Sequence, residues 1–294
     1  MPIAPNWLQS LIRTESLPPQ FEDLAVTHYL PLADAVVGWA KPESGPLVVG
    51  VNGAQGTGKS TMSKVLALAL EHEHQLSCAI ISIDDIYLTR DERSQLACDV
   101  HPLLQTRGVP GTHDVAMGID LIQQLKARKT PAIPVFDKAV DDRAPESQWV
   151  SFTHPVDVIL FEGWCVGAMA QPASALTEPC NQLEKTEDAD AAWRSYVNAQ
   201  LETAYPQLFA LMDRLVMLKA PDFECVYEWR RLQEDKLRLR QQGAGIMDDE
   251  QITRFIMHYE RLTRWMFQEM PDRADCVLEL SHDHSIATAK YLNR

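Results

Sequence analysis

The chain has 294 residues, of which 46% are hydrophobic and 23% are charged, as in ordinary globular proteins. This length fits one large α/β domain or two small ones, and we predict one domain over residues 1–294. The formal net charge of -14 argues against nucleic acid or an anionic membrane surface as the main partner, because both repel an acidic protein.

The first predicted elements are helices followed by a strand. Residues 7–40 carry apolar side chains at roughly helical spacing, so we expect a helical lead-in that ends near residue 45. A turn is expected at 42–46. The apolar run 47–51 is typical of a buried parallel strand. An Ala- and Leu-rich helix is expected next, over about 60–72.

The segment between that strand and that helix spells G-x-x-x-x-G-K-S, the phosphate-binding loop of nucleoside-triphosphate enzymes. Its glycines let the chain wrap closely around an anion, and the start of the helix adds N–H groups and a favourable dipole. Lys59 would reach the β- and γ-phosphates, and Ser60 would coordinate Mg²⁺. A chance glycine-rich turn would not require the flanking strand and helix. The residues expected to bind ATP are Gly53, Ala54, Gln55, Gly56, Thr57, Gly58, Lys59, Ser60 and Thr61.

The remaining predicted elements alternate between strands and helices. Strands or extended pieces are expected at 79–83, 132–136, 156–161, 215–218 and 276–280, and helices at 118–128, 222–241 and 249–268. The last two helices would join at 243–245, and the polar, acidic stretch 170–190 predicts an excursion loop. This alternation predicts an α/β fold of the P-loop NTPase type, with a mostly parallel sheet and helices on both faces.

Carboxylates follow two of the predicted strands, at the edge where such sheets bind ligands. Phosphoryl transfer needs bound phosphates, a metal and a group that orients or deprotonates the acceptor. We expect Asp84 to accept the proton of an acceptor hydroxyl and to lie near the metal as a further ligand. Glu162 is expected to hold Mg²⁺. Of the pair Asp84 and Asp85, we expect one to serve the reaction and the other to cap the following helix. In the alternative interpretation Glu162 is only a carboxylate at the start of a helix.

Two charged loops, 107–114 and 136–143, lie between the candidate base and Glu162. A lone charged loop is usually solvated surface, but two at this place favour contact with a small polar or anionic acceptor. Arg107 suits a carboxylate. The predicted substrate-binding residues are Asp85, Tyr87, Arg107, His113, Asp114, Asp137, Lys138 and Arg143.

A basic run begins at Arg230 and Arg231 on the helix 222–241. One interpretation is a solvated helix with i,i+4 pairs, such as Glu234 with Arg238. The other is a mobile lid over 222–270 that places a guanidinium group on the transferring phosphoryl group. We favour the lid, with Arg230 as the catalytic arginine.

Cysteine and histidine spacing gives no strong metal motif. The six cysteines show no C-x-x-C pair, so reduced thiols explain them better than disulfides or zinc. His282 and His284 are weak evidence for a metal without further ligands, and we expect a terminal loop there, near the adenine. Residues 1–18 contain no apolar signal core and no apolar stretch could span a bilayer, so we expect a cytoplasmic protein.

Several motifs together resemble the D-glycerate 3-kinase-like group, which is related to uridine kinase, pantothenate kinase and phosphoribulokinase. After the phosphate loop they are S-I-D-D-I-Y-L-T (82–89), R-G-V-P-G-T-H-D (107–114), F-D-K (136–138), F-E-G-W (161–164) and W-R-x-x-Q-E (229–234). The resemblance covers about residues 47–284. It implies a base at Asp84, a Mg²⁺ ligand at Glu162 and a lid arginine at Arg230 or Arg231. The A-V-D-D-R segment after F-D-K is shorter and less Gly/Ser-rich than expected of a glycerate kinase, which bears on the acceptor and not on the kinase chemistry.

We therefore expect an ATP- and Mg²⁺-dependent kinase that phosphorylates a hydroxyl group of a small metabolite. D-Glycerate is the leading acceptor, since its carboxylate would suit Arg107 or Arg143, and a nucleoside, pantothenate or a sugar is the alternative. A GTPase switch normally carries N-K-x-D, which the chain lacks. A nucleotide-binding module without catalysis would not need Lys59, Asp84 and Glu162 together. The sequence indicates no oligomeric state.

Overall fold

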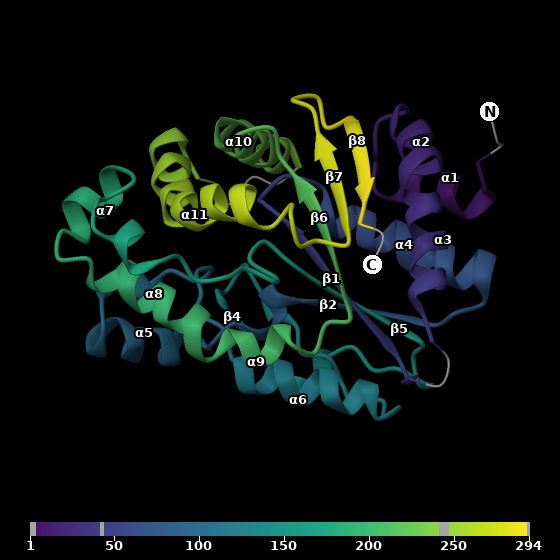
Figure 1. Ribbon diagram of the computed structural model, residues 1–294, viewed down its shortest axis with the longest axis horizontal. Helices are drawn as coiled ribbons and strands as arrows, with labels where there is room; N and C mark the ends of the chain where they lie inside the picture. Colours follow the sequence, from purple (N-terminus) through teal and green to yellow (C-terminus); the bar gives the residue numbers. More distant parts are fainter. Residues whose placement is uncertain (1–3, 42–43, 241–246, 293–294) are drawn as a thin grey trace.

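The central feature of the fold is a mixed, mostly parallel sheet (Figure 1). The computed structural model describes residues 4–41, 44–240 and 247–292, with the main chain alone for Gln233 and residues 235–240. Within these residues the sheet contains β1 (Leu47–Gly53), β2 (Cys78–Ser82), β5 (Val158–Gly163), β6 (Arg214–Lys219), β7 (Cys276–Leu280) and β8 (Ile286–Tyr291). Their order is β2-β5-β1-β6-β7-β8, and only the β7–β8 pairing is antiparallel. The predicted α/β fold is confirmed.

Helices cover both faces of this sheet (Figure 1). One face packs against α1 (Asn6–Thr14), α2 (Phe21–Leu24), α3 (Leu30–Trp39), α4 (Lys59–His74) and α10 (Phe223–Arg240). The other packs against α6 (Val115–Lys126), α8 (Ala192–Thr203), α9 (Tyr205–Phe209) and α11 (Asp249–Glu269), of which α11 also reaches the first face. The helices α5 (Arg90–Asp99) and α7 (Gln182–Glu187) lie to the left in Figure 1. None of the helices described is long and apolar enough to cross a bilayer.

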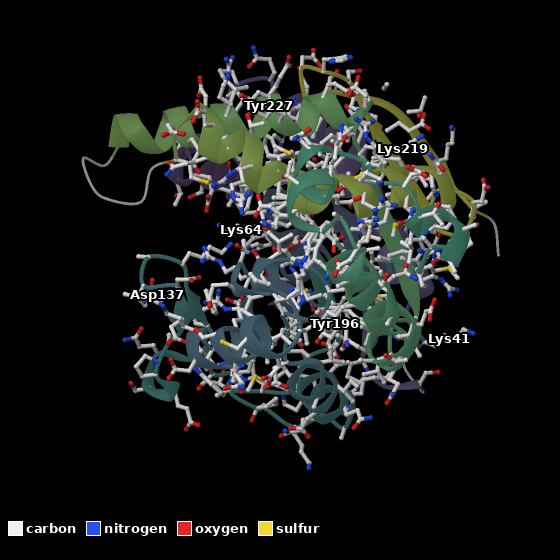
Figure 2. All side chains as sticks on the ribbon, turned by 90° about the vertical axis from the view of Figure 1, so that its left-hand side faces the viewer. Lys41, Lys64, Asp137, Tyr196, Lys219 and Tyr227 are labelled. Atoms are coloured by element: carbon white, nitrogen blue, oxygen red, sulfur yellow. The ribbon has the colours of Figure 1, made fainter. Side chains whose placement is uncertain are left out.

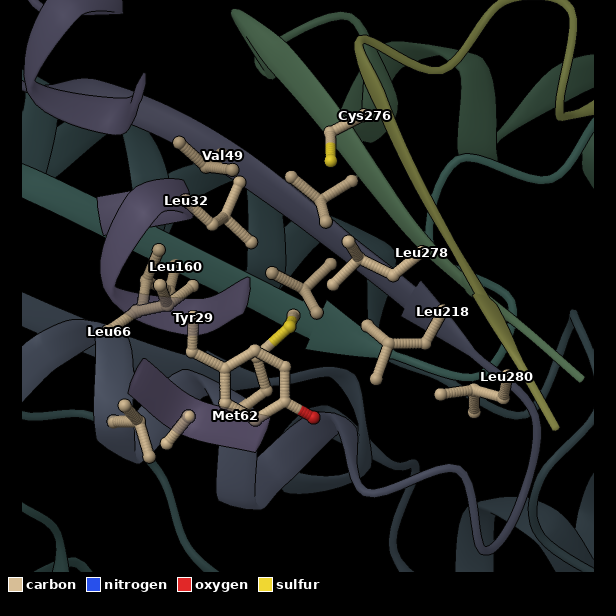
Figure 3. Close-up of a cluster of buried hydrophobic side chains, with 14 of the residues drawn as sticks. Tyr29, Leu32, Val49, Met62, Leu66, Leu160, Leu218, Cys276, Leu278 and Leu280 are labelled. Atoms are coloured by element: carbon tan, nitrogen blue, oxygen red, sulfur yellow. The ribbon is translucent and has the colours of Figure 1, made fainter. Parts of the chain in front are cut away.

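The N-terminal lead-in belongs to the core. Neighbouring residues of β1 alternate between the two faces of the sheet, so Val48 and Val49 lie in different apolar clusters. Figure 3 shows the cluster that contains Val49, where Tyr29 and Leu32 of the lead-in pack beside Met62 of α4. Burying one such side chain contributes roughly 1.5–3 kcal/mol. The lead-in therefore stabilises the face of the sheet that packs against α4, the helix that follows the phosphate loop.

Several predicted elements need correction. The predicted excursion loop 170–190 contains α7 and a 3-10 helix, Ala173–Leu176, and the helices α8 and α9 follow it. The charged loop 136–143 is a small antiparallel pair of β3 (Phe136–Asp137) and β4 (Asp142–Arg143). The strand β8 was not expected at all. The predicted helix junction 243–245 and part of the predicted turn at 42–46 lie outside the described residues.

Candidate active site

The phosphate loop joins β1 to α4 as expected. Gly56 and Gly58 adopt positive φ angles of 85° and 87°, which other residues rarely tolerate. A Cβ at Gly56 would also lie 2.6 Å from the Cβ of Trp229 on α10. Helix α4 begins at Lys59, directly after Gly58, so its first N–H groups point into the loop. The loop therefore has the backbone shape and the dipole that a phosphate group requires.

The ends of β1, β5 and β2 bring the predicted carboxylates to this loop. Strand pairing places Ser82 opposite Glu162 and Asn52 opposite Gly163. The Ser60 hydroxyl donates a hydrogen bond of 2.7 Å to Glu162 Oε1. Glu162 is 4% exposed, and its Oε2 is buried without a hydrogen-bond partner.

An unpartnered buried carboxylate oxygen beside a hydroxyl group is a costly arrangement unless a cation completes it. Oxygen ligands of this kind suit Mg²⁺, which binds through one or two carboxylates, a phosphate and water. Ser60 and Glu162 therefore fit the metal role that the sequence predicts for them. Asp84 lines the same cavity, in keeping with its predicted place near the metal.

Asp84 is held in an ionised state by its neighbours. Its carboxylate accepts hydrogen bonds of 2.7 Å from Lys138 Nζ and from Tyr87 Oη. Burial alone would raise the pKa of Asp84, but the charges of Lys138 and Lys59 and these two hydrogen bonds together lower it to about 2. The side chain is thus a permanent anion at neutral pH, able to accept a proton or to orient a hydroxyl group.

Asp85 has a different environment and corrects one prediction. Neither aspartate caps the next helix: both lie in a 3-10 helix, Ile83–Ile86, and Thr89 caps α5. Asp85 Oδ1 accepts a hydrogen bond of 3.1 Å from the N–H of Phe136. Burial, reinforced by the negative charge of Asp84, raises the pKa of Asp85 to about 6 despite that hydrogen bond.

This raised pKa predicts that Asp85→Asn stabilises the protein above pH 6. Between about pH 4 and 6 the folded protein binds more protons than the unfolded chain, so stability falls as pH rises. The shift from 3.8 to about 6 corresponds to at most about 3 kcal/mol, and the amide oxygen can keep the Phe136 hydrogen bond. Urea unfolding at about pH 4 and pH 7 measures the gain, which should be near zero at the lower pH. The exposed Asp99→Asn is the control, and an unchanged pH dependence in Asp85→Asn would contradict the prediction.

The phosphate loop and Asp84 open onto one cavity of about 660 Å³. Its walls come from the helices α10 and α11, the phosphate loop, the segment after β2, the β3–β4 turn and the loop that precedes α6. In Figure 2 the projecting end of α10 lies above the segment that carries Asp137. Among the predicted site residues, the cavity is lined by Gln55, Gly56, Lys59, Ser60, Asp84, Tyr87, Arg107, Lys138, Glu162 and Arg230.

Cations gather on the acceptor side of the cavity, where an aspartate neutralises two of them. Arg107 forms an ion pair with Asp141, and its guanidinium group lies 5.3 Å from the centre of the Phe136 ring. The fully buried Arg93 donates to the carbonyl oxygen of Asp141 at 2.7 Å and lies 3.1 Å from its carboxylate. Arg107 therefore faces the cavity with a carboxylate already bound.

Aromatic side chains fix the loop that carries Arg107. Tyr259 Oη donates a hydrogen bond of 3.2 Å to the carbonyl oxygen of Arg107, and Trp164 Nε1 donates one of 2.8 Å to that of Gly108. A Cβ at Gly108, whose φ is +133°, would collide with the Tyr259 hydroxyl group. The first glycine in R-G-V-P-G-T-H-D, Gly108, is thus required by close packing, and Trp164 of F-E-G-W is one of its packing partners.

Arg230 and Arg231, the two arginines of the predicted lid, have different surroundings. Arg230 lines the cavity, where it pairs with the buried Glu234 and lies 5.3 Å from the centre of the Phe255 ring. Arg231 is exposed, since adjacent helical residues point about 100° apart. The i,i+4 ion pair of Glu234 in the structure is with Arg230. The pair of Glu234 with Arg238 that the alternative interpretation expects involves a side chain outside the described part of the chain.

Five predicted substrate-binding residues do not line the cavity: Asp85, His113, Asp114, Asp137 and Arg143. The His113 ring stacks on Tyr87 with 4.6 Å between centroids, and burial lowers its pKa to about 4. Asp114 caps α6, and Arg143 donates to the carbonyl oxygen of Tyr87 at 2.9 Å. His113 and Arg143 therefore contact Tyr87 from behind the cavity wall. Of the two arginines predicted to bind the acceptor, Arg107 is the one that lines the cavity.

Other cavity residues were not singled out from the sequence. They are Ser82, Arg93, Gln105, Thr106, Asp141, Trp164, Met247, Phe255 and Tyr259. Trp164 had a signal, because it belongs to the quoted F-E-G-W motif. Tyr259 and Phe255 lie one turn apart on α11 and carry no local motif.

The loop after β7 contacts the phosphate loop. His284 Nε2 lies 3.0 Å from the carbonyl oxygen of Gly56, and its ring packs against that of Trp229 with 4.1 Å between centroids. Trp229 Nε1 in turn donates to the carbonyl oxygen of His282 at 3.1 Å. The predicted loop at His282 and His284 is therefore next to the nucleotide side of the site.

Comparisons with known proteins agree with this geometry, although no family model matches the chain. The chain is 33% identical over 229 residues to an uncharacterized kinase of Schizosaccharomyces pombe, and this alignment covers 74% of the present chain and 80% of the yeast protein. It is 32% identical over 224 residues to the chloroplastic D-glycerate 3-kinase of Arabidopsis thaliana, covering 73% of this chain and 46% of the plant protein. The structure of D-glycerate 3-kinase from Cryptococcus neoformans matches with a TM-score of 0.71 at 27% identity, covering 84% and 90% of the two chains.

The fold, the phosphate loop and the carboxylates beside it define a P-loop kinase, a phosphotransferase with a hydroxyl group as acceptor. More closely, the chain belongs to the D-glycerate 3-kinase-like group of these enzymes.

Proposed function

We propose that this kinase transfers the γ-phosphoryl group of ATP to a hydroxyl group of D-glycerate. The observation that carries the proposal is one cavity lined by Lys59, Asp84 and Arg107. These residues supply a phosphate contact, an acceptor for the hydroxyl proton and a guanidinium group for a carboxylate. The names of the plant and Cryptococcus relatives support the same acceptor.

On the nucleotide side, the phosphate loop binds the phosphates through its N–H groups and Lys59. Ser60 and Glu162 would hold Mg²⁺, which supplies charge neutralisation when bound. Arg230 is placed to stabilise charge on the transferring group, held in position by Glu234. Such preorganised charges contribute most when water is excluded.

On the acceptor side, the hydroxyl oxygen forms a bond to the γ-phosphorus as the bond to the β–γ bridging oxygen breaks, and ADP leaves. The hydroxyl proton passes to Asp84. With a pKa of about 2, Asp84 is a weak base, so it orients the hydroxyl group first and receives the proton late, as a loose transition state allows. The acceptor hydroxyl group replaces Lys138 or Tyr87 as a hydrogen-bond partner of Asp84.

The acceptor carboxylate would take the place of Asp141 on Arg107. Bidentate pairing with a planar guanidinium group favours a carboxylate over a neutral group. Arg93, Arg107 and Lys138 line this side of the cavity together with Asp84 and Asp141, so an excess of one positive charge favours a small anion over a nucleoside or a neutral sugar. Pantothenate also carries a carboxylate and is the rival acceptor that the same charge would admit.

The proposal is tested by ADP release from the purified protein with a panel of hydroxylated metabolites. We expect D-glycerate to give the highest kcat/KM, with L-glycerate, pantothenate, uridine and fructose far below it. A higher kcat/KM for any of these alternatives would overturn the acceptor assignment while leaving the kinase chemistry intact.

Arg107→Ala should raise the KM for the acceptor and leave the KM for ATP nearly unchanged. A charge-assisted contact is worth about 1.5–3 kcal/mol, which corresponds to roughly 10–100-fold in KM. Steady-state kinetics with each substrate varied in turn gives the answer. The exposed Arg90→Ala on α5 is the matched control, and a rise confined to the KM for ATP would show that the acceptor pocket is misplaced.

Arg230→Ala should mainly lower kcat, because its contact strengthens as charge redistributes in the transition state. Its exposed neighbour Arg231→Ala provides the control and should behave as wild type. If Arg231→Ala lowered kcat more than Arg230→Ala, a different face of α10 would point into the cavity during the reaction.

A further inference from the structure

Three side chains with metal-ligand chemistry meet at the start of α10, outside the cavity. Asp222 and Cys225 come from the N-terminal end of this helix, and His282 comes from the loop after β7. Cys225 Sγ lies 3.0 Å from His282 Nδ1, and Asp222 Oδ2 lies 3.6 Å from His282 Nε2. Ligand atoms of all three residues lie within 4.8 Å of one another.

The ligand types select a particular kind of ion. A thiolate, an imidazole and a carboxylate together are the donors of Zn²⁺ sites, whereas Mg²⁺ avoids sulfur and prefers oxygen ligands. Zn–S and Zn–N bonds of about 2.3 and 2.0 Å at a tetrahedral angle separate the two donor atoms by about 3.5 Å. The observed 3.0 Å between sulfur and nitrogen needs only a small adjustment to reach this spacing.

Local structure explains part of this cluster but not all of it. Asp222 accepts a hydrogen bond of 2.9 Å from the N–H of Cys225, as a residue at the start of a helix often does. Helix capping requires neither the sulfur of Cys225 nor a histidine 57 residues further along the chain. Cys225 is 1% exposed, while the side chains of Asp222 and His282 are 39% and 71% exposed. An ion can therefore enter from solvent, and water can complete its coordination.

We propose that Asp222, Cys225 and His282 form a binding site for Zn²⁺. Binding forms a bond between sulfur and zinc, and the thiol proton of Cys225 passes to solvent. The sequence left His282 without partners, and the fold supplies two. Since the carbonyl oxygen of His282 binds Trp229 and His284 contacts Gly56, the ion would fasten the start of α10 beside the phosphate loop.

The test uses Co²⁺ as a spectroscopic substitute for Zn²⁺ on the full-length protein, without ATP or acceptor. Wild-type protein should show a sulfur-to-cobalt charge-transfer band in the near ultraviolet that saturates at one equivalent and disappears when Zn²⁺ is added. Cys225→Ser should lose this band. His282→Gln, at an exposed position, removes one of the three ligands. It should weaken Co²⁺ binding at least 10-fold, which is the smallest loss seen when even a residue that supports a ligand is changed.

Two controls locate the ion. Cys98→Ser changes an exposed cysteine elsewhere, and His101→Ala changes a second cluster with Asp188 and Asp190, so both variants should keep the band. Absence of the band at saturating Co²⁺, or a band that survives both Cys225→Ser and His282→Gln, would overturn the proposal. Kinase activity is not the readout, so the outcome is independent of the acceptor assignment.

Discussion

Lys59→Ala should reduce ADP production to background while the protein stays folded. Lys59 lies at the first position of α4, lines the cavity and is not part of either large apolar cluster. We expect its ammonium group to contact the β- and γ-phosphates of ATP. Losing a preorganised charge at the transferring group costs roughly 10²–10³-fold or more in kcat. ADP release measured alongside a thermal melt separates lost chemistry from lost folding.

The matched control is Lys64→Ala on the same helix. Lys64 forms an ion pair of 2.7 Å with Glu15 and its side chain is 47% exposed; its position is labelled in Figure 2. An exposed ion pair contributes at most about 1 kcal/mol, so activity and melting temperature should hardly change. Full activity in Lys59→Ala would disprove the phosphate-loop assignment.

The sequence predicted those parts of the fold whose signals are local. The phosphate loop, β1 and α4 follow from a contiguous motif between a buried apolar run and a helix. The helices α7 and α8 gave no such signal because polar groups are buried there. Glu184 is fully buried and pairs with Arg261, and the buried Arg194 pairs with Asp188. Hydrophobic periodicity is weak in helices whose buried faces combine apolar side chains with charged ones.

The candidate site was predictable where residues follow the ends of neighbouring strands. Parallel pairing places Ser82 opposite Glu162. Asp84, just after β2, and Glu162, within β5, therefore lie at the same edge of the sheet and line the same cavity. The charged loops were harder, because a charged side chain in a loop can cap a helix, pair with a neighbour or face a ligand. Asp114 caps α6, whereas Arg107 lines the cavity. Tyr259 reaches the cavity only through tertiary packing of α11, which no local pattern encodes.

Asp84→Asn should cut turnover by roughly 10²–10⁴-fold, the usual contribution of a positioned acid or base, with a much smaller effect on ATP binding. The amide cannot accept the proton of the acceptor hydroxyl group, and it loses the charge that pairs with Lys138. Because the pKa of Asp84 is about 2, this residue should contribute no acidic limb to the kcat/KM profile above about pH 4. Single-turnover kinetics and nucleotide-binding titrations separate the chemical step from binding.

Asp85→Asn is the matched comparison, because it changes the adjacent residue in the same way. Asp85 does not line the cavity and its carboxylate accepts from the main chain of Phe136, a role that an amide oxygen can keep. Its turnover should therefore fall far less than that of Asp84→Asn, while its stability rises above pH 6. If both results are found, the charge of Asp84 serves the reaction and the charge of Asp85 destabilises the fold. If Asp85→Asn were the more damaging to turnover, the proton acceptor would be the wrong one of the pair.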